Sequence, residues 1–194
     1  MDRLGCYLGT RTVPRASMRF AIVLLAGVTP LAIPAQSPRG SGTSIALLNL
    51  AFYGQRATEL KADDSLLAHA ATASMRDYLR HVDGVTLTDS AVTAAAERSQ
   101  RALDAAAGKP CNVIVACARA VGQELGVRWV VMAKVSKTTD LIWVLSGQLI
   151  DVPTGKLVYD DVYELKGNAH DIVPKGARVW AQRITERIAS PSTP

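Results

Sequence analysis

The hydrophobic positions of this 194-residue chain change their spacing several times, and each spacing predicts one kind of element. Residues 45–52 (IALLNLAF) form a nearly continuous apolar run, which is typical of a strand covered on both faces. In residues 62–82 the apolar positions recur at helical spacing, which predicts a helix with Asp63 or Asp64 as its N-cap. The short β-branched segment 84–89 then predicts a second strand.

Two more helices are expected before the chain returns to strands. The first opens at Asp89, runs through an alanine-rich segment and stops at Gly108. Its alanine-rich surface indicates a helix that is only half buried. The second occupies residues 112–125, where the apolar positions share one helical face, and it ends at Gly126.

Three strands follow in quick succession, at residues 128–136, 140–150 and 155–165. Their linkers have hairpin length, so the three strands are expected to be antiparallel neighbours. The middle strand is apolar on both sides, whereas the last alternates polar and apolar residues and is interpreted as a partly wet edge strand. Apolar residues at helical spacing over 173–188 predict a final helix.

The element order β-α-β-α-α-β-β-β-α predicts an α/β fold (α+β mixed) with a single mixed sheet. Strands joined through helices form its parallel part, the C-terminal three-strand meander forms its antiparallel part, and the helices pack on it. Residues 45–189 are expected to be one domain. Residues 36–44 are expected to be a flexible tether, and residues 190–194 a disordered tail.

The first 35 residues have the layout of a secretory signal peptide. Arginines precede the apolar run 20–35, which ends in the small residue Ala35. The run is shorter than a membrane-spanning helix and contains two prolines. An uncleaved anchor or a buried N-terminal helix is the alternative, and Met18 is a possible true start. Cleavage predicts a periplasmic protein with no stable membrane insertion.

This prediction changes how the charge is interpreted. The whole chain carries a formal charge of +5, but the leader holds four basic residues and one acidic residue. The remainder has 18 basic and 16 acidic residues, a net charge of +2. Such a balance does not favour nucleic acid as a partner. Cys6 also leaves with the leader, so two cysteines remain in an oxidising compartment.

Those two cysteines, Cys111 and Cys117, are six positions apart. In one continuous helix they would lie about 9 Å apart along the axis, too far for the usual Cα separation of a disulfide. A bond therefore requires Cys111 to lie in the turn before the helix, where Asn112 could act as the cap. A redox-active pair would more often be C-x-x-C, so the sequence predicts a structural disulfide.

No motif for a metal or a cofactor is found. The histidines His69, His81 and His170 show no ligand spacing with the cysteines or with one another, and there is no P-loop or dinucleotide fingerprint. Ser146 lacks the G-x-S-x-G context of a nucleophile. It is interpreted as a packing position, where Gly147 lets another element lie close to the sheet.

The acidic pairs are also interpreted as structural. Asp160 and Asp161 are neighbours on one strand, so they point to opposite faces and cannot act together. For a hydrolase, the best candidates are Ser136, Asp140 and His170, which are adjacent to strand ends but form no motif.

The segment CNVIVACARAVGQELGVRWVVMAKVSKTTDLIWVLSGQLIDVPTGKLV resembles a family of uncharacterised secreted bacterial proteins, a domain of unknown function. That pattern is similar to the amino-terminal domain of TolB and, more distantly, to the CsgG-type domain. The resemblance covers residues 44–188, with Ala133 where the relatives usually have glycine. It implies a fold and an envelope location, and it carries no catalytic residues. Because a propeller and a lipobox cysteine are missing, it transfers neither TolB's propeller contacts nor a secretion-pore role.

The leading hypothesis is a non-catalytic periplasmic accessory or scaffold protein that binds another envelope protein. A small-molecule-binding module is the alternative, and an unrecognised hydrolase is the third possibility. Candidate contact surfaces are the edge strand, which could accept a partner strand, and the basic face of the last helix. The corresponding residues are Tyr159, Asp161, Tyr163, Arg178, Arg183 and Arg187.

Overall fold

The computed structural model describes residues 43–54, 57 and 59–190. The chain divides into two compact units, 1–39 and 40–194, and the second contains all the described residues. The predicted leader, the tether as far as residue 42, and residues 191–194 of the predicted tail lie outside the described residues. Thr43 and Ser44, expected at the end of the tether, belong instead to the first strand.

The strands of the described residues form one mixed sheet, as predicted, but there are six of them where the sequence predicts five. They are β1 (Thr43–Leu47), β2 (Ala51–Tyr53), β3 (Val85–Leu87), β4 (Trp129–Lys137), β5 (Ile142–Asp151) and β6 (Lys156–Lys166). Their order is β3-β1-β4-β5-β6, and β2 also pairs with β4. The pairs β1–β3, β1–β4 and β2–β4 are parallel, whereas β4–β5 and β5–β6 are antiparallel. β6 is therefore an edge strand, which confirms the prediction.

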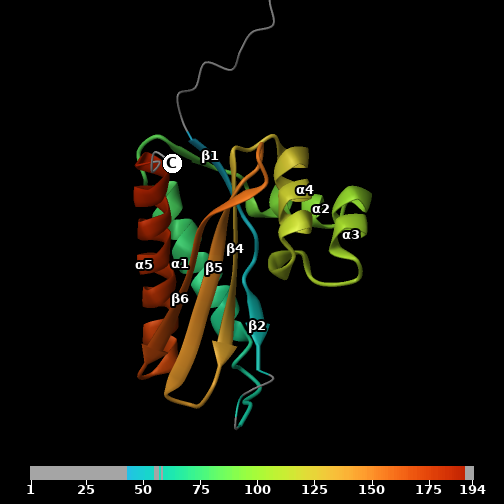
Figure 1. The fold of residues 1–194 in the computed structure, drawn as a ribbon. Coiled ribbons are helices and arrows are strands. Elements are labelled where there is room, and N and C mark those ends of the chain that lie inside the picture. Colours follow the sequence, from blue (N-terminus) through green and yellow to red (C-terminus); the bar gives the residue numbers. More distant parts are fainter. Residues whose placement is uncertain (1–42, 55–56, 58, 191–194) are drawn as a thin grey trace, which may run out of the picture. The chain divides into compact units, whose positions relative to one another are not determined.

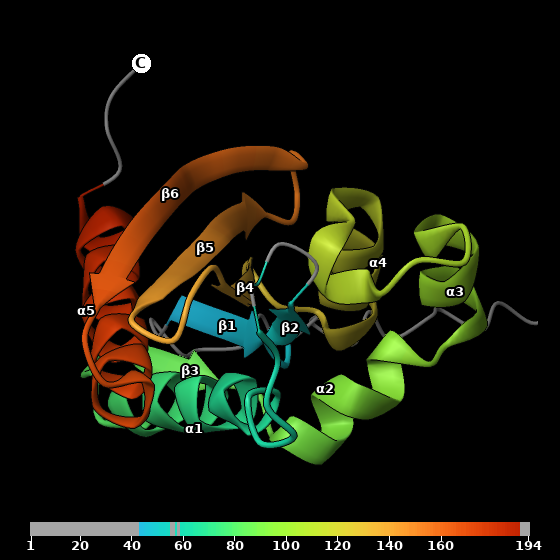
Figure 2. The same ribbon diagram turned by 90° about the horizontal axis from the view of Figure 1, so that it is seen from below.

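Helices cover both faces of the sheet (Figures 1 and 2). They are α1 (Leu66–Arg80), α2 (Ser90–Glu97), α3 (Gln100–Ala106), α4 (Val115–Leu125) and α5 (Ala169–Ala189), with the 3-10 turn η1 at Cys111–Val113. Figure 2 shows α1 and α5 on one side of the sheet and α2, α3 and α4 on the other. Each side therefore has its own core.

The core under α1 and α5 is the larger one. Its sheet residues alternate along the strands, as with Val131, Val135 and Leu145, and they meet apolar residues of both helices. Trp180 of α5 is fully buried there. A Cβ atom built on Gly147 of β5 would lie 2.6 Å from Cη2 of Trp180, so the glycine does let another element lie close to the sheet, as predicted.

The core on the opposite face is smaller and stops part way along the strands. Val130 and Met132 of β4 and Ile150 of β5 pack there against α4 and its neighbours. Beyond Met132, the β4 residues on this face, Lys134 and Ser136, are polar. Figure 1 shows α4 beside one end of the strands only, with no helix over the part next to β2. The prediction that the middle strand is apolar on both sides was therefore wrong, because Ser146 and Gln148 of β5 face this uncovered part.

Two predicted elements are each divided in two. The first apolar run forms β1 and β2, because the backbone N–H of Leu50 donates to Thr72 Oγ1 of α1 (3.0 Å). The alanine-rich helix breaks after Glu97, because the side chain of Ser99 accepts from Ala102 N and begins a second helix. Asp89 caps the first of these helices, as predicted.

Other predicted boundaries were also wrong. The N-cap residue of α1 is Ser65, not Asp63 or Asp64, because the Asp64 carboxylate binds Lys137. Asn112 does not cap α4, since its amide donates to Asn49 O (2.8 Å). The final helix begins at Ala169, before the predicted start, because Asn168 accepts from His170 N and caps it there.

The disulfide predicted from the sequence joins Cys111 and Cys117, whose Cα atoms lie 5.1 Å apart. Cys111 lies in η1, before α4, and Cys117 lies in the first turns of α4. Both side chains are buried in the smaller core, so the bond ties η1 to the helix that covers the sheet.

Replacing both cysteines with alanine is expected to lower the free energy of unfolding by about 2 kcal/mol, the loop-closure value for a six-residue separation. Urea denaturation of the two proteins measures this difference, and a reducing agent should destabilise the parent but not the variant. Mass spectrometry of non-reduced protein that detects two free thiols would contradict the assignment.

Candidate functional site

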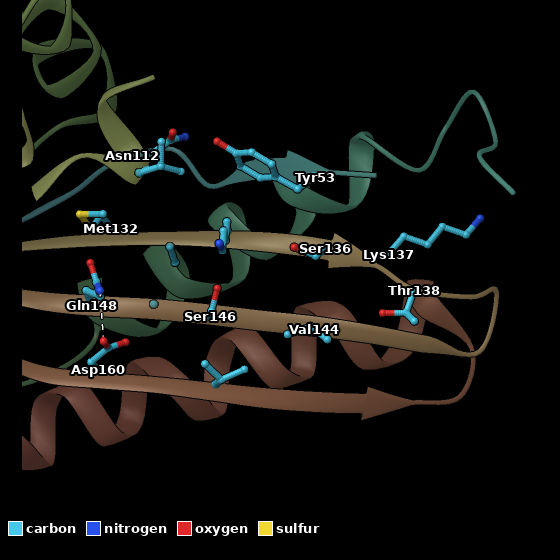
Figure 3. Close-up of a pocket in the computed structure, with 15 residues that line it drawn as sticks. Tyr53, Asn112, Met132, Ser136, Lys137, Thr138, Val144, Ser146, Gln148 and Asp160 are labelled. Carbon is cyan, nitrogen blue, oxygen red and sulfur yellow. Dashed lines mark hydrogen bonds between the residues drawn. The ribbon is translucent and has the colours of Figure 1, made fainter. Parts of the chain in front are cut away.

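The uncovered part of the sheet forms a groove of about 650 Å³ (Figure 3). Its floor is made by β4, β5 and β6, and its wall by Tyr53 of β2 and by Asn112 and Val113 of η1. Every second residue of the strands points into it, because side chains alternate between the two faces of a sheet. The floor therefore presents Lys134 and Ser136 from β4 together with residues from the two neighbouring strands.

The groove has polar residues at its centre and apolar residues among them. The ammonium of Lys134 lies 5.5 Å from the centre of the Tyr53 ring, a cation–π contact. At one end, Gln148 Nε2 donates to Asp160 Oδ2 (3.1 Å), and Figure 3 shows this pair beside Met132. Val162 of β6 is 61% exposed and extends the floor toward the edge of the sheet.

A second, smaller hollow of about 300 Å³ lies at the other face, where the loop before α1 meets the β4–β5 turn. Beside it, Lys137 Nζ donates to Asp64 Oδ2 and to Asp140 Oδ1, both at 2.7 Å. Asp140 Oδ2 also accepts from Lys61 Nζ (2.9 Å). The Lys137 and Asp64 side chains are only 1% and 7% exposed, whereas Lys61 and Asp140 are about half exposed, so the network of alternating charges runs from a buried pair to the surface.

The network changes the acidity of its members. Hydrogen bonds from Lys137 and Lys61 lower the pKa of Asp140 to about 2. Burial acts most strongly on Asp64 and raises its pKa, but the hydrogen bonds from Lys137 and from the Lys61 backbone, together with the charge of Lys137, make the net shift downward. Burial likewise acts to lower the pKa of Lys137, and the hydrogen bonds to Asp140 and Asp64 raise it overall. The four groups therefore stay charged at neutral pH.

The structure does not assemble the three hydrolase candidates. Ser136 lines the groove, whereas Asp140 and His170 line the smaller hollow on the other face. Asp140 is held by the two lysines, and His170 Nε2 faces Asp63 Oδ2 at 3.8 Å. Asp160 and Asp161 face opposite sides of the sheet, as the strand alternation predicts.

The predicted contact residues of the edge strand lie on the face covered by α5. The Tyr159 hydroxyl donates to Asp161 Oδ2 (2.7 Å) and lies 3.2 Å from the Tyr163 hydroxyl. The bond from Tyr159 lowers the pKa of Asp161, and burial raises the pKa of Tyr163. The other carboxylate oxygen of Asp161 accepts from the backbone N–H of Val162 (2.8 Å).

The three arginines predicted for the basic face of the last helix bind elements next to α5. Arg183 lies over the Tyr163 ring at 5.7 Å, and Arg187 Nε donates to Val158 O (3.3 Å). Arg178 Nη1 donates to Asp77 Oδ2 of α1 (2.9 Å). Five of the six predicted residues therefore line the seam between β6 and α5, and Arg178 lies at the seam between α1 and α5.

Sequence reasoning missed Tyr53, Lys134, Gln148 and the buried Lys137. A signal was present for the groove, since Lys134 and Ser136 are polar at alternate positions of one strand. Alternation of this kind predicts one wet face. The sequence holds no comparable signal for Lys137, because its buried partner Asp64 is 73 positions away and its near partner Asp140 is half exposed.

Among the residues the structure describes, no group of three or more histidine, cysteine, aspartate or glutamate side chains is placed to hold a metal ion. His69 on α1 and His81, the residue that follows the last residue of α1, are both exposed. None of the helices in the same residues combines the length and the hydropathy needed to cross a membrane.

Comparison with known proteins identifies one family and several solved structures of low similarity. The family described as "DUF3280: Protein of unknown function (DUF2380)" matches residues 43–184. Among the curated proteins, none matches the chain.

Solved structures with a related fold share little sequence with the chain. The LpoB C-terminal domain from Salmonella enterica is 16% identical, with a TM-score of 0.47 over 66% of this chain and 84% of that one. TolB from Acinetobacter baumannii is 14% identical, with a TM-score of 0.46 over 76% of this chain and 28% of that one. The PelC dodecamer from Paraburkholderia phytofirmans is 15% identical, with a TM-score of 0.43 over 75% and 86%. Scores this low support no conclusion about what the chain binds.

Proposed function

We propose that this chain, which belongs to the DUF3280 family of proteins of unknown function, is a non-catalytic accessory protein of the cell envelope. In this proposal it binds another envelope protein. The observation that carries the proposal is the half-covered sheet. A sheet face without a covering layer leaves side chains and apolar surface open to a partner. Here that face is grooved, and it continues to the edge strand β6.

The disulfide supports the envelope location. Disulfides persist in oxidising compartments such as the periplasm and are rare in the cytosol. The Cys111–Cys117 bond is buried in the core under α4, so it is part of the fold and not a surface modification. The basic and apolar layout of residues 1–35 supports the same location, since it is the layout of a secretory signal.

A non-catalytic role is supported by the separation of the candidate side chains. Ser136 lies on the groove side of β4, and the carboxylate of Asp140 forms ion pairs with Lys61 and Lys137. A nucleophile needs a base within hydrogen-bond reach, and the structure places no histidine of the described chain beside Ser136.

The proposed contact surface extends from the groove over Val162 to the seam between β6 and α5. The seam holds Tyr159, Asp161, Tyr163, Arg183 and Arg187, and Arg178 lies on the same helix. Addition of a partner strand to β6 would have to displace Asp161 from Val162 N and Arg187 from Val158 O. We therefore propose that the groove makes the main contact and that the seam contributes at its rim.

Site-specific photocrosslinking in cells that express the full chain tests this function. A crosslinking residue at Val162 is expected to yield one dominant adduct with an envelope protein. The matched control is Leu103, which is 52% exposed on α3, and it should yield no such adduct. An equal pattern at both positions, or no adduct at Val162 and none at Arg183, would contradict the proposal.

A small-molecule-binding module is the second candidate, because a groove of about 650 Å³ falls in the range of ligand sites. Native mass spectrometry of protein purified from the periplasm distinguishes the two. A bound small molecule that is released by substitutions in the groove would favour this candidate over the protein partner.

A further inference from the structure

Four hydrogen-bond donors lie next to one another on the floor and wall of the groove. Tyr53 is paired in register with Ser136, and Lys134 is paired with Ser146. Paired residues lie about 5 Å apart, and alternate residues of one strand about 7 Å apart. The side chains of these four residues, called the donor quartet below, therefore surround a single spot (Figure 3 labels three of them).

The donor quartet has no partner of opposite charge within the described part of the chain. The three hydroxyl groups make no hydrogen bond to other described residues, and the ammonium of Lys134 contacts only the Tyr53 ring. The acids nearest on β6 have other partners: Asp160, at one end of the groove, accepts from the neutral amide of Gln148 and keeps its charge, and Glu164 pairs with Lys166 (2.9 Å). One positive charge and three neutral donors are therefore open to a ligand.

This combination fits a carboxylate. An ammonium group offers donors only, and a carboxylate offers acceptors only. Hydrogen bonds between two such charged groups are stronger than those between neutral groups. A single cation matches the single charge of a carboxylate, and the cation–π contact holds the Lys134 side chain over the groove before a ligand arrives.

We propose that the donor quartet binds the carboxylate of an acidic side chain within an extended segment of the partner protein. This inference rests on the proposed function and names the chemistry of the partner at the groove. An extended segment is favoured over a free small acid, because the apolar surface continues past the quartet through Val144 and Val162 to the edge of the sheet. The segment's neighbouring side chains would cover these valines.

Nuclear magnetic resonance titration of the purified domain tests the inference. The probe is a mixture of capped pentapeptides with glutamate fixed at the centre, and the matched probe has glutamine there. The glutamate mixture should shift the backbone amide signals of Ser136 and Ser146, with at least tenfold weaker binding for the glutamine mixture. Lys134→Met should weaken binding at least tenfold and Lys134→Arg much less. Lys156→Met, an exposed lysine at the start of β6, should change it less than twofold.

Four outcomes would overturn the inference. Unchanged binding of the glutamate mixture to Lys134→Met would show that the lysine holds no carboxylate, and absent shifts at Ser136 and Ser146 would show that the groove is not the site. Free glutarate that binds as tightly as the peptides would replace the partner segment with a small acid. A crosslinked partner that is captured at Val162 equally in the parent and in Lys134→Met would preserve the proposed function while the carboxylate site fails.

Discussion

A Lys137→Met variant is expected to melt about 10 °C below the parent protein at pH 7, because it strands a buried charge. In the parent, the ammonium binds Asp64 and Asp140, each at 2.7 Å, and the lysine side chain is 1% exposed. Methionine keeps the length of the side chain but removes the charge. The Asp64 carboxylate, whose side chain is 7% exposed, then keeps only the hydrogen bond from the backbone N–H of Lys61 (2.8 Å). Differential scanning calorimetry measures the change.

The same variant should change how stability depends on pH. The pKa of Asp140 is lowered from 3.8 to about 2, and that of Asp64 is lowered as well. Groups with a lowered pKa stabilise the fold fully above the unfolded value and lose this contribution as pH falls through the folded value. The parent should therefore lose stability between about pH 4 and pH 2. Without Lys137, burial raises the pKa of Asp64. The difference in the free energy of unfolding between variant and parent should therefore become smaller in that pH window.

Two further variants separate the buried charge from the surface charge. Lys61→Met removes an exposed partner of Asp140 and should lower the melting temperature by no more than about 2 °C, as expected for a surface pair. Changing Asp64 to asparagine together with Lys137→Met should recover part of the loss, since the buried carboxylate is then absent. The interpretation fails if Lys137→Met lowers the melting temperature at pH 7 by no more than Lys61→Met does.

The elements that the sequence predicts well are those whose pattern lies within one continuous segment. The helical spacing of Leu67 and Met75 predicts α1, and the hairpin-length linkers predict the antiparallel order of β4, β5 and β6. In each case, residues close in the chain carry the whole signal, since periodicity decides the buried face and linker length decides the direction of the next strand.

Features that depend on distant segments were not predicted. The charge network joins Lys61, Asp64, Lys137 and Asp140, and nothing near Lys137 in the sequence indicates that it is buried. The groove exists because α4 covers only part of the strands, and the extent of that cover depends on tertiary packing. Lys134 and Ser136 alternate in β4, as Ser146 and Gln148 do in β5, but the sequence prediction took β5 as apolar on both sides and so missed the groove.

Gly147 combines a feature that the local sequence predicts with a neighbour that only the structure identifies. The sequence predicts a close approach at this glycine, and the structure identifies the neighbour as Trp180. Replacing Gly147 with valine should lower the free energy of unfolding by about 3 kcal/mol, because the new side chain and the indole would occupy the same space. Valine suits strands better than glycine, but that preference spans only about 1 kcal/mol, so the overlap should decide the sign.

A double-mutant cycle with Trp180→Phe distinguishes this overlap from a general effect on β5. Phenylalanine removes the part of the indole that the new side chain would meet, while Trp180 itself is fully buried and cannot turn out into solvent. Gly147→Val should therefore lower the free energy of unfolding by at least about 1 kcal/mol less in the Trp180→Phe background, as expected for residues in contact. Ser146→Val is the matched control, since it places the same side chain on the open side of the same strand and should change stability little. Equal costs of Gly147→Val in the two backgrounds, measured by urea denaturation, would show that the indole does not set the limit at this position.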